Sequence, residues 1–150
     1  MSRKISDLNP NVAEMCGRHI EACNAADIQL VVYSTRRTEA EQALLYAQGR
    51  YLDQLPDAVA ALIAGEIRHW REQGYYIGPG NIVTRRYGPD CPHVLGIAYD
   101  CVAVVDGKAV WNDLALWERI GTLGEAQGAE WGGRWPTFPD RPHFQQRRET

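Results

Sequence analysis

The segment 97–111 constrains the fold of this chain more than any other part of the sequence. An apolar run over 97–105 predicts a long strand, and 108–111 predicts a returning strand. Between them, Asp106-Gly107 is a strong signal for a two-residue hairpin turn. Helical patterns stand apart from this hairpin and do not alternate regularly with strands. An α+β fold is therefore favoured over repeated βαβ units.

Elsewhere the pattern predicts a strand over 29–34, a glycine-rich loop over 74–80 and a tail, 129–145, with room for short strands only. Four further helices have start or stop signals: Asn9-Pro10 to Cys23, Thr38 to Gly49, Asp57 to Trp70, and Asp113 to Gly128. No repeat or linker divides the chain, so we expect a single domain over 1–150.

Composition excludes several classes of function. Sixteen Lys and Arg against nineteen Asp and Glu give a net charge of −3, which argues against nucleic-acid binding. No apolar run reaches the roughly 20 residues that span a membrane, and the polar start predicts no signal peptide. We therefore expect synthesis in the cytoplasm, and the four cysteines are expected to be free thiols because their spacing fits no zinc ribbon.

Asp100 lies in the middle of the predicted long strand, where it shares a face with apolar side chains. An ionised carboxylate on such a face costs free energy unless a cation or hydrogen-bond donors pair with it. A metal ion, an arginine or backbone N–H groups could serve. A salt-bridged or hydrogen-bonded aspartate is the commoner outcome for a buried charge.

Two histidines could join Asp100 in a metal site. His93 stands seven residues before Asp100, and His143 lies in an aromatic tail, three residues after Asp140. Two histidines and one aspartate can supply three protein ligands to zinc and leave the fourth position for water. Asp140 could then take the proton of that water. Taken alone, His143 would be read as a structural histidine.

The remaining two histidines are poorer candidates for a site. We expect His19, beside the apolar stripe of the first helix, to pack or to meet solvent. His69, beside Trp70, is expected at the solvent edge of its helix.

Arg37 lies on the turn between the predicted strand 29–34 and the following helix. A guanidinium there is well placed to donate to a substrate carbonyl or carboxylate. The alternative is a surface arginine, as its neighbour Arg36 illustrates. Gln42, one turn into the helix, could support the same pocket or be exposed.

Three ordered motifs make the chain resemble, from about Leu8 to Gln145, a known family: the zinc peptidoglycan peptidases. This family includes phage L-alanyl-D-glutamate endopeptidases and D-alanyl-D-alanine carboxypeptidases and dipeptidases. The motifs are Ser34-Thr35-Arg36-Arg37-Thr38 with Gln42, Cys91-Pro92-His93 leading to Gly96, Ala98 and Asp100, and Glu130-Trp131-Gly132 leading to Asp140-Arg141-Pro142-His143.

The resemblance implies a site and a fold. It makes His93, Asp100 and His143 the ligands of one Zn²⁺ ion, Asp140 the catalytic base, and Arg37 the residue that binds substrate and stabilises the transition state. Gln42 and Trp131 are expected to border the substrate, although the aromatic core is the more usual place for a tryptophan such as Trp131. The implied fold is a small antiparallel sheet with packed helices, like that of Hedgehog and the DD-peptidases.

The chain also departs from the family's pattern. Cys91 stands where the family has serine, and Thr35 stands where glycine is common. The stretch 51–78 is longer than in compact members and could border the cleft or simply pack.

The function implied by the resemblance is hydrolysis of peptidoglycan stem peptides by a monomeric enzyme. We expect a phage or prophage endolysin that cleaves the L-alanyl-D-glutamate bond and reaches the wall after holin-type release. A D-alanyl-D-alanine carboxypeptidase or dipeptidase is the alternative. A catalytically silent wall-binding module is a further one, disfavoured because a binder would not need all four site residues.

Overall fold

The computed structural model describes residues 1–64, 67–75 and 78–149. Contacts within the chain group it into two compact units. Unit 1 comprises Met1–Arg36 and Gly96–Thr150, and unit 2 comprises Arg37–Leu95. Each unit is described by itself.

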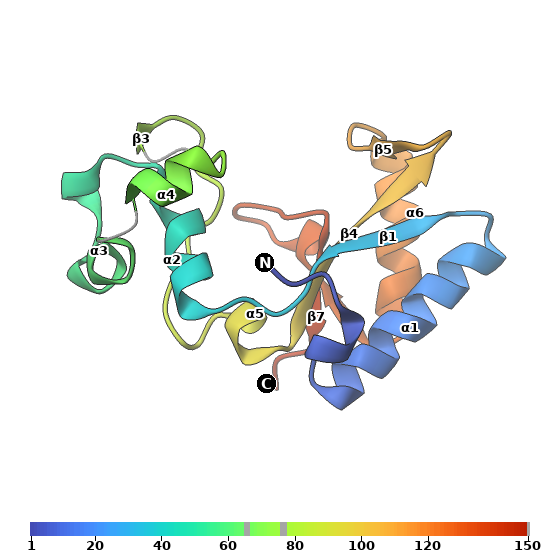
Figure 1. Ribbon diagram of the computed structural model, residues 1–150. Helices are drawn as coiled ribbons and strands as arrows, with labels where there is room; N and C mark the ends of the chain where they lie inside the picture. The colour runs from blue at the N-terminus through green and yellow to red at the C-terminus, as the bar shows by residue number, and fades with distance from the viewer. Residues whose placement is uncertain (65–66, 76–77, 150) are drawn as a thin grey trace. The chain divides into compact units, whose positions relative to one another are not determined.

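Unit 1 is built on an antiparallel sheet in which the strand order is β1-β4-β7-β6 (Figure 1). Its strands are β1 (Leu30–Ser34), β4 (Ala98–Val105), β5 (Lys108–Val110), β6 (Ala129–Trp131) and β7 (His143–Gln146). Along one edge, β4 pairs with β1; along the other, it pairs with β7 near its start and with β5 near its end. The predicted α+β class and the predicted hairpin are both confirmed.

The hairpin turn has the backbone conformation that its sequence demands. Asp106 has a φ of 51° and Gly107 a φ of 76°, so both central residues lie in the left-handed region. A two-residue turn of this kind matches the right-handed twist of the flanking strands. The turn therefore fixes the register in which β5 returns along β4.

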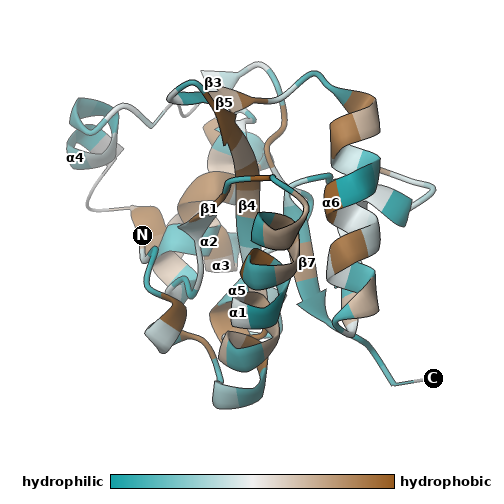
Figure 2. Ribbon diagram, turned by 90° about the vertical axis from the view of Figure 1, so that its right-hand side faces the viewer, coloured by the Kyte–Doolittle hydropathy of each residue, from teal (hydrophilic) through white to brown (hydrophobic). Residues whose placement is uncertain are grey.

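Helices α1 (Pro10–Ala25) and α6 (Leu114–Ala126) pack on one face of this sheet (Figure 1). The brown, apolar positions of both helices in Figure 2 include buried side chains of the core. Each helix begins at its predicted signal, with Pro10 in the first turn of α1 and the Asp113 carboxylate accepting from Leu116 N in α6. Two short 3₁₀ turns, Ile5–Asp7 and Gly132–Arg134, complete the unit.

His19 is fully buried in this core, which settles its open alternatives in favour of packing. Its Nδ1 lies 3.0 Å from the Tyr99 hydroxyl and its Nε2 lies 2.9 Å from the Ile120 carbonyl oxygen. A carbonyl can only accept, so Nε2 donates and Nδ1 accepts from the tyrosine. The ring therefore joins α1, β4 and α6 as a neutral, structural histidine.

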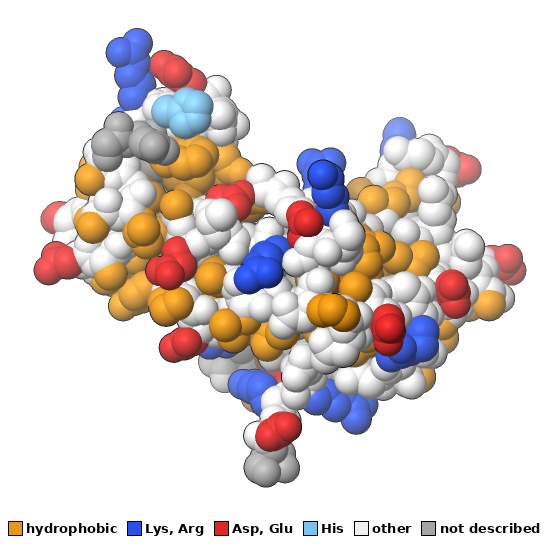
Figure 3. Space-filling view, turned by 60° about the horizontal axis from the view of Figure 1, so that its bottom comes forward, with side chains coloured by type: hydrophobic (Ala, Val, Ile, Leu, Met, Phe, Trp, Pro, Cys, Tyr) orange, Lys and Arg blue, Asp and Glu red, His pale blue; other side chains and the backbone are white. Residues whose placement is uncertain are grey.

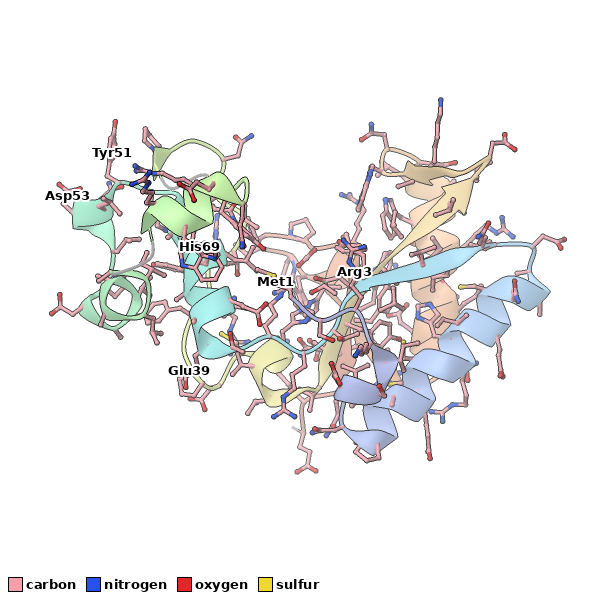
Figure 4. All side chains as sticks on the ribbon, in the orientation of Figure 1. Met1, Arg3, Glu39, Tyr51, Asp53 and His69 are labelled. Atoms are coloured by element: carbon pink, nitrogen blue, oxygen red, sulfur yellow. The ribbon has the colours of Figure 1, made fainter. Side chains whose placement is uncertain are left out.

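Unit 2 is mostly helical and has a small core of its own. Its elements are α2 (Glu39–Ala47), β2 (Gln48–Gly49), a 3₁₀ turn (Leu52–Gln54), α3 (Asp57–Ile63), α4 (Ile67–Glu72), β3 (Gly78–Pro79) and α5 (Pro92–Leu95). The core residues are Ala43, Leu44, Ala47, Leu55, Val59 and Ile63. The predicted capping box at Thr38 is present and starts α2. Figure 4 labels Glu39 in the first turn of α2, and Tyr51 and Asp53 at the 3₁₀ turn.

Unit 2 also differs from the sequence prediction in three ways. The helix expected from Asp57 to Trp70 is described as α3, which ends at Ile63, and α4, which begins at Ile67; residues 65–66 lie outside the described residues. Asp57, the predicted start signal, is the first helical residue, and Pro56 takes the cap position. The predicted loop 74–80 contributes β3, which pairs in parallel with β2.

Two further predictions concern the exposure of His69 and the absence of a membrane-spanning segment. His69, on α4, is exposed as expected and lies 3.0 Å from the Gln73 amide nitrogen (Figure 4). Among the described residues, the helices are all too short or too polar to cross a membrane.

Replacing His19 with alanine should destabilise the protein because it leaves the Tyr99 hydroxyl and the Ile120 carbonyl buried without their partner. We expect the free energy of unfolding to fall by about 2–4 kcal/mol. The matched control is the exposed His69→Ala, expected to change it by less than about 0.5 kcal/mol. Urea denaturation of both variants measures the difference, and equal effects would contradict the structural role of His19.

The difference in stability between wild type and His19→Ala should also depend on pH. Burial lowers the pKa of His19 below its ordinary value of 6.5, and the hydrogen bond to Ile120 only partly opposes this. As pH falls below that ordinary value, the unfolded chain takes up a proton that the folded chain resists. The free energy of unfolding of wild type therefore falls on acidification. The difference in this free energy between wild type and His19→Ala should become smaller.

Candidate metal centre

Asp100 and His143 are neighbours across two strands of unit 1. The register of β4 with β7 places them opposite each other, and the Asp100 Oδ1 lies 3.2 Å from His143 Nδ1. Both are buried, with exposures of 8% and 6%. Their chain neighbours Tyr99 and Phe144 point to the other side, into the core against α1 and α6, because successive side chains of a strand alternate between faces.

Hydrogen bonding fixes which nitrogen of His143 is available to a metal. Nε2 lies 2.8 Å from the Gln145 side-chain oxygen, which can only accept, so Nε2 carries a hydrogen. Nδ1 then faces the Asp100 carboxylate. A bare lone pair there would be repelled by the carboxylate, so a proton or a metal cation belongs between the two atoms.

Charge around His143 agrees with this requirement for a cation. Burial lowers the pKa of the imidazole, but the hydrogen bond to Asp100 and the charges of Asp100 and Asp140 outweigh it and raise the pKa. A pocket that stabilises a protonated ring also stabilises a metal ion bound in place of the proton. The donor chemistry at His143 and Asp100 therefore fits a divalent cation.

His93 supplies the third donor. It lies in α5, the short helix that leads through Gly96 into β4, and it is 4% exposed. The ligand atoms of His93, Asp100 and His143 all lie within 4.8 Å of one another, close enough to hold one ion. Two imidazole nitrogens and a carboxylate oxygen form a donor set typical of catalytic zinc. The structure thus brings together the three ligands that the sequence predicted.

The chain turns sharply at Gly96 before it enters β4. Gly96 has a φ of 76°, a backbone conformation that side chains other than glycine rarely adopt. Its carbonyl accepts a 2.9 Å hydrogen bond from Asn9 N, and a side chain at this position would press on Asn9. Position 96, at the entry to β4, therefore favours glycine.

Asp140 is half-buried on the turn that precedes β7. Its backbone N donates to the Gly132 carbonyl at 2.9 Å, and its own carbonyl accepts from His143 N at 3.2 Å. A side chain at position 132 would clash with the Asp140 carbonyl, so Gly132 is needed for this turn. The charge of Asp140 acts on His143, as the raised pKa shows.

Glu130, the other carboxylate of the same region, is already engaged. Its Oε2 accepts from Trp135 Nε1 at 3.0 Å, from Arg148 Nη2 at 2.8 Å and from Gln145 Nε2 at 3.3 Å. Partial burial raises the pKa of Glu130, but the hydrogen bonds from Arg148 and Trp135 bring it below its ordinary value. A carboxylate held in this way is a poor proton acceptor.

Trp131 occupies the aromatic core. It is 3% exposed, its ring stacks near Phe144 at a centroid distance of 6.2 Å, and its Nε1 donates to the Arg141 carbonyl at 2.8 Å. This position favours the core alternative over a place in the cleft. Trp135, which is half-buried, lies closer to the site, with its ring 5.2 Å from that of His143.

Arg37 and Gln42 lie in unit 2, where they contact each other. Arg36 is exposed, whereas Arg37 is half-buried and its Nη1 donates to the Gln42 side-chain oxygen at 3.2 Å. Gln42 in turn donates to the Arg86 carbonyl at 2.9 Å. The Arg37 backbone N also donates to the His93 carbonyl at 3.0 Å, which ties the arginine turn to the helix that carries a metal ligand.

Cys91 is buried two residues before His93, at 3% exposure. Burial raises the pKa of its thiol, although the nearby charges of Arg86 and Arg37 act in the opposite direction. Because a thiol must lose its proton to bind a metal, the protonated state disfavours Cys91 as a ligand.

Sequence reasoning gave no role to Gln145, although it contacts a metal ligand. The spacing of the two residues could have indicated this contact. Residues two apart on a strand share a face, so Gln145 lies on the same side of β7 as His143. What the sequence lacked was the pairing of β7 with β6, which places Glu130 opposite Gln145.

Two comparisons of the sequence identify similar proteins. A family described as D-alanyl-D-alanine carboxypeptidase matches residues 85–146, a range that contains all three donors and Asp140. The chain is also 28% identical over 149 residues to the peptidoglycan L-alanyl-D-glutamate endopeptidase CwlK of Bacillus subtilis, covering 93% of this chain and 74% of that protein.

Two solved structures share the fold. The L-Ala D-Glu endopeptidase ChiX of Serratia marcescens matches with a TM-score of 0.56 and 19% identity, over 95% of this chain and 83% of that one. The vancomycin-resistance D,D-pentapeptidase VanY, solved in complex with Zn(II), matches with a TM-score of 0.51 and 11% identity, over 93% and 72%. Together with the sequence matches, these findings confirm the family resemblance that the three motifs predicted.

Removing any one of the three donors should reduce bound metal. We expect the purified protein to contain about one zinc ion, and His93→Ala, Asp100→Ala and His143→Ala each to contain much less. His69→Ala, on an exposed helix face, is the matched histidine control and should keep its zinc. Elemental analysis after dialysis measures the content, and full zinc in all three donor variants would refute the assignment.

Proposed function

We propose that this chain is a zinc-dependent L-alanyl-D-glutamate endopeptidase, one of the peptidoglycan peptidases that it resembles. The observation that carries the proposal is the buried cluster of His93, Asp100 and His143, with Asp140 on the adjoining turn. The similarity to CwlK and ChiX supports the choice of bond, since both are described as endopeptidases for that linkage.

His93, Asp100 and His143 would hold the metal ion, and the Asp140 carboxylate would accept and return a proton. Zinc bound at such a site supplies a polarised substrate carbonyl and a water that ionises near pH 7. The Asp140 carboxylate would take up a proton from the attacking water and later pass it to the nitrogen of the leaving amine. Glu130 is unsuited to this task because its carboxylate is already hydrogen-bonded to Arg148 and Trp135.

Arg37 and Gln42 act on the substrate. The guanidinium of Arg37 donates to the scissile carbonyl oxygen as negative charge develops there, and a fixed donor of this kind contributes a few kcal/mol to transition-state stabilisation, of the order of 3. Gln42 holds the guanidinium through its side-chain oxygen and is itself held by the Arg86 carbonyl. Trp131, on the neighbouring strand β6, stacks near Phe144, which follows His143 on β7.

Cleavage of D-alanyl-D-alanine ends is the second candidate, because the matching family is described as a D-alanyl-D-alanine carboxypeptidase. Digestion of purified peptidoglycan, followed by mass spectrometry of the products, separates the two. A new free amine on glutamate identifies the endopeptidase, whereas released D-alanine identifies the carboxypeptidase. No product from zinc-loaded protein would mean a wall-binding module.

The biological setting that we propose is lysis of a bacterial host by a phage or prophage enzyme. The enzyme would reach the wall only after a holin-type pore opens the membrane. Expression in bacteria with and without a holin tests this. Lysis only with the holin supports the proposal, and lysis without it or in neither case contradicts it.

Replacing Asp140 with alanine separates the base from the ligands. The variant should keep its zinc and lose about 10²–10⁴-fold in kcat, the usual cost of a missing proton-transfer group. Asp53→Ala, an exposed aspartate in unit 2, is the control and should keep both zinc and rate. Loss of zinc from Asp140→Ala would make Asp140 a ligand, and an unchanged rate would move the base elsewhere.

Arg37 and Arg36 form a matched pair of neighbouring arginines. Arg37→Ala should retain zinc, and its kcat should fall more than its KM rises, because the guanidinium acts mainly in the transition state. Arg36→Ala, which removes an exposed side chain, should leave kcat and KM near those of wild type. Steady-state kinetics on a synthetic stem peptide measures both, and equal losses in the two variants would refute the assignment to Arg37.

A further inference from the structure

A row of hydrogen bonds extends across the sheet from His143 Nε2, the ring nitrogen that does not face Asp100. His143 Nε2 donates to the Gln145 side-chain oxygen at 2.8 Å. Gln145 is 2% exposed and lies on the same face of β7 as His143. The ring nitrogen that does not face the metal donors therefore has one buried protein acceptor, supplied by the next residue on that face.

The orientation of the Gln145 amide is itself fixed. In the register of β6 with β7, Glu130 is directly opposite Gln145, and the Gln145 Nε2 donates to Glu130 Oε2 at 3.3 Å. A carboxylate cannot donate, so the amide nitrogen must face Glu130 and the amide oxygen must face His143. A flipped amide would lose both hydrogen bonds.

Glu130 is in turn held in place from two directions. Arg148 contacts both carboxylate oxygens, with Nη2 at 2.8 Å from Oε2 and Nε at 3.1 Å from Oε1. Trp135 Nε1 donates to Oε2 at 3.0 Å. Arg148 follows β7 in the C-terminal tail. Figure 3 shows Lys and Arg side chains interspersed with Asp and Glu on one face of the protein. The row thus runs from Arg148 through Glu130 and Gln145 to His143.

We propose that Gln145 is a positioning residue for the metal, and that Glu130 with Arg148 and Trp135 keeps its amide in the required orientation. Gln145 holds the hydrogen of His143 on Nε2, which leaves Nδ1 as the metal-binding nitrogen and fixes the plane of the ring. Outer partners of this kind also make the imidazole a stronger ligand, and their loss typically weakens metal binding about 10–100-fold. The proposal rests on the proposed zinc site.

The test compares Gln145→Leu with Gln146→Leu. Leucine at 145 keeps the approximate volume but cannot accept from His143, whereas Gln146 is exposed and points to the other side of β7. Competition with a chromophoric chelator measures zinc affinity. Gln145→Leu should bind zinc about 10–100-fold more weakly than wild type, and Gln146→Leu should match wild type.

A rescue variant distinguishes positioning from simple packing. Glu130→Gln combined with Gln145→Glu exchanges the two groups, so that position 145 still accepts from His143 and position 130 can donate to position 145. The double variant should recover the zinc affinity that Gln145→Leu loses. Wild-type affinity in Gln145→Leu, or no recovery in the exchanged variant, would overturn the proposal.

A spectroscopic measurement on the wild-type protein tests the proposal even if a variant fails to fold. The ¹⁵N spectrum of the zinc-loaded wild type should show His143 bound through Nδ1, with a hydrogen on Nε2. Zinc bound through Nε2 would overturn the role of Gln145. A wild type that binds no zinc would refute the proposed function itself, whereas equal zinc binding in wild type and Gln145→Leu would refute only this inference.

Discussion

The structure depends on a buried carboxylate and a buried imidazole held opposite each other in an antiparallel sheet. Asp100 and His143 lie on β4 and β7, with their facing atoms 3.2 Å apart. The ionised Asp100 carboxylate could not remain buried alone, because burying an uncompensated charge costs several kcal/mol, about 3–5 when one partner of a pair is lost. A cation between them, either a proton or a metal ion, resolves this cost. The buried pair therefore requires a cation, and the proposed catalysis uses a metal cation at the same place.

The rest of unit 1 can be understood as the support for this pair. On one side of the sheet, Tyr99 and Phe144 anchor β4 and β7 against α1 and α6, and the neutral His19 joins the layers. On the other side, the same alternation presents Asp100, His143 and Gln145. A one-residue slip of β7 would exchange these two faces and destroy both the core and the site. Packing of the core therefore fixes the strand register, and the register fixes which side chains face the metal site.

Local signals were sufficient to predict much of this arrangement. Asn9-Pro10, the capping box at Thr38, the turn at Asp106-Gly107 and the cap at Asp113 each carry their structural meaning within a few residues, and all four are present. The parallel pairing of Gln48–Gly49 with Gly78–Pro79 joins segments that are far apart in the sequence, so a local pattern could not predict it. The side on which Trp131 lies, and the pairing of Gln145 with Glu130, likewise follow only from the register of β6 with β7. The donor triad could be named in advance because its motif resembles a family, whereas its hydrogen-bonded support could not.

The most direct test of this account is the location of zinc in crystals of the wild-type protein, measured by anomalous diffraction at the zinc absorption edge. We predict one strong peak at about 2.0–2.2 Å from His143 Nδ1, a carboxylate oxygen of Asp100 and a ring nitrogen of His93. The Gln145 side-chain oxygen should remain hydrogen-bonded to His143 Nε2. A peak held by other residues, or no peak in crystals grown with excess zinc, would contradict the central claim that this buried pair forms the core of a metal centre.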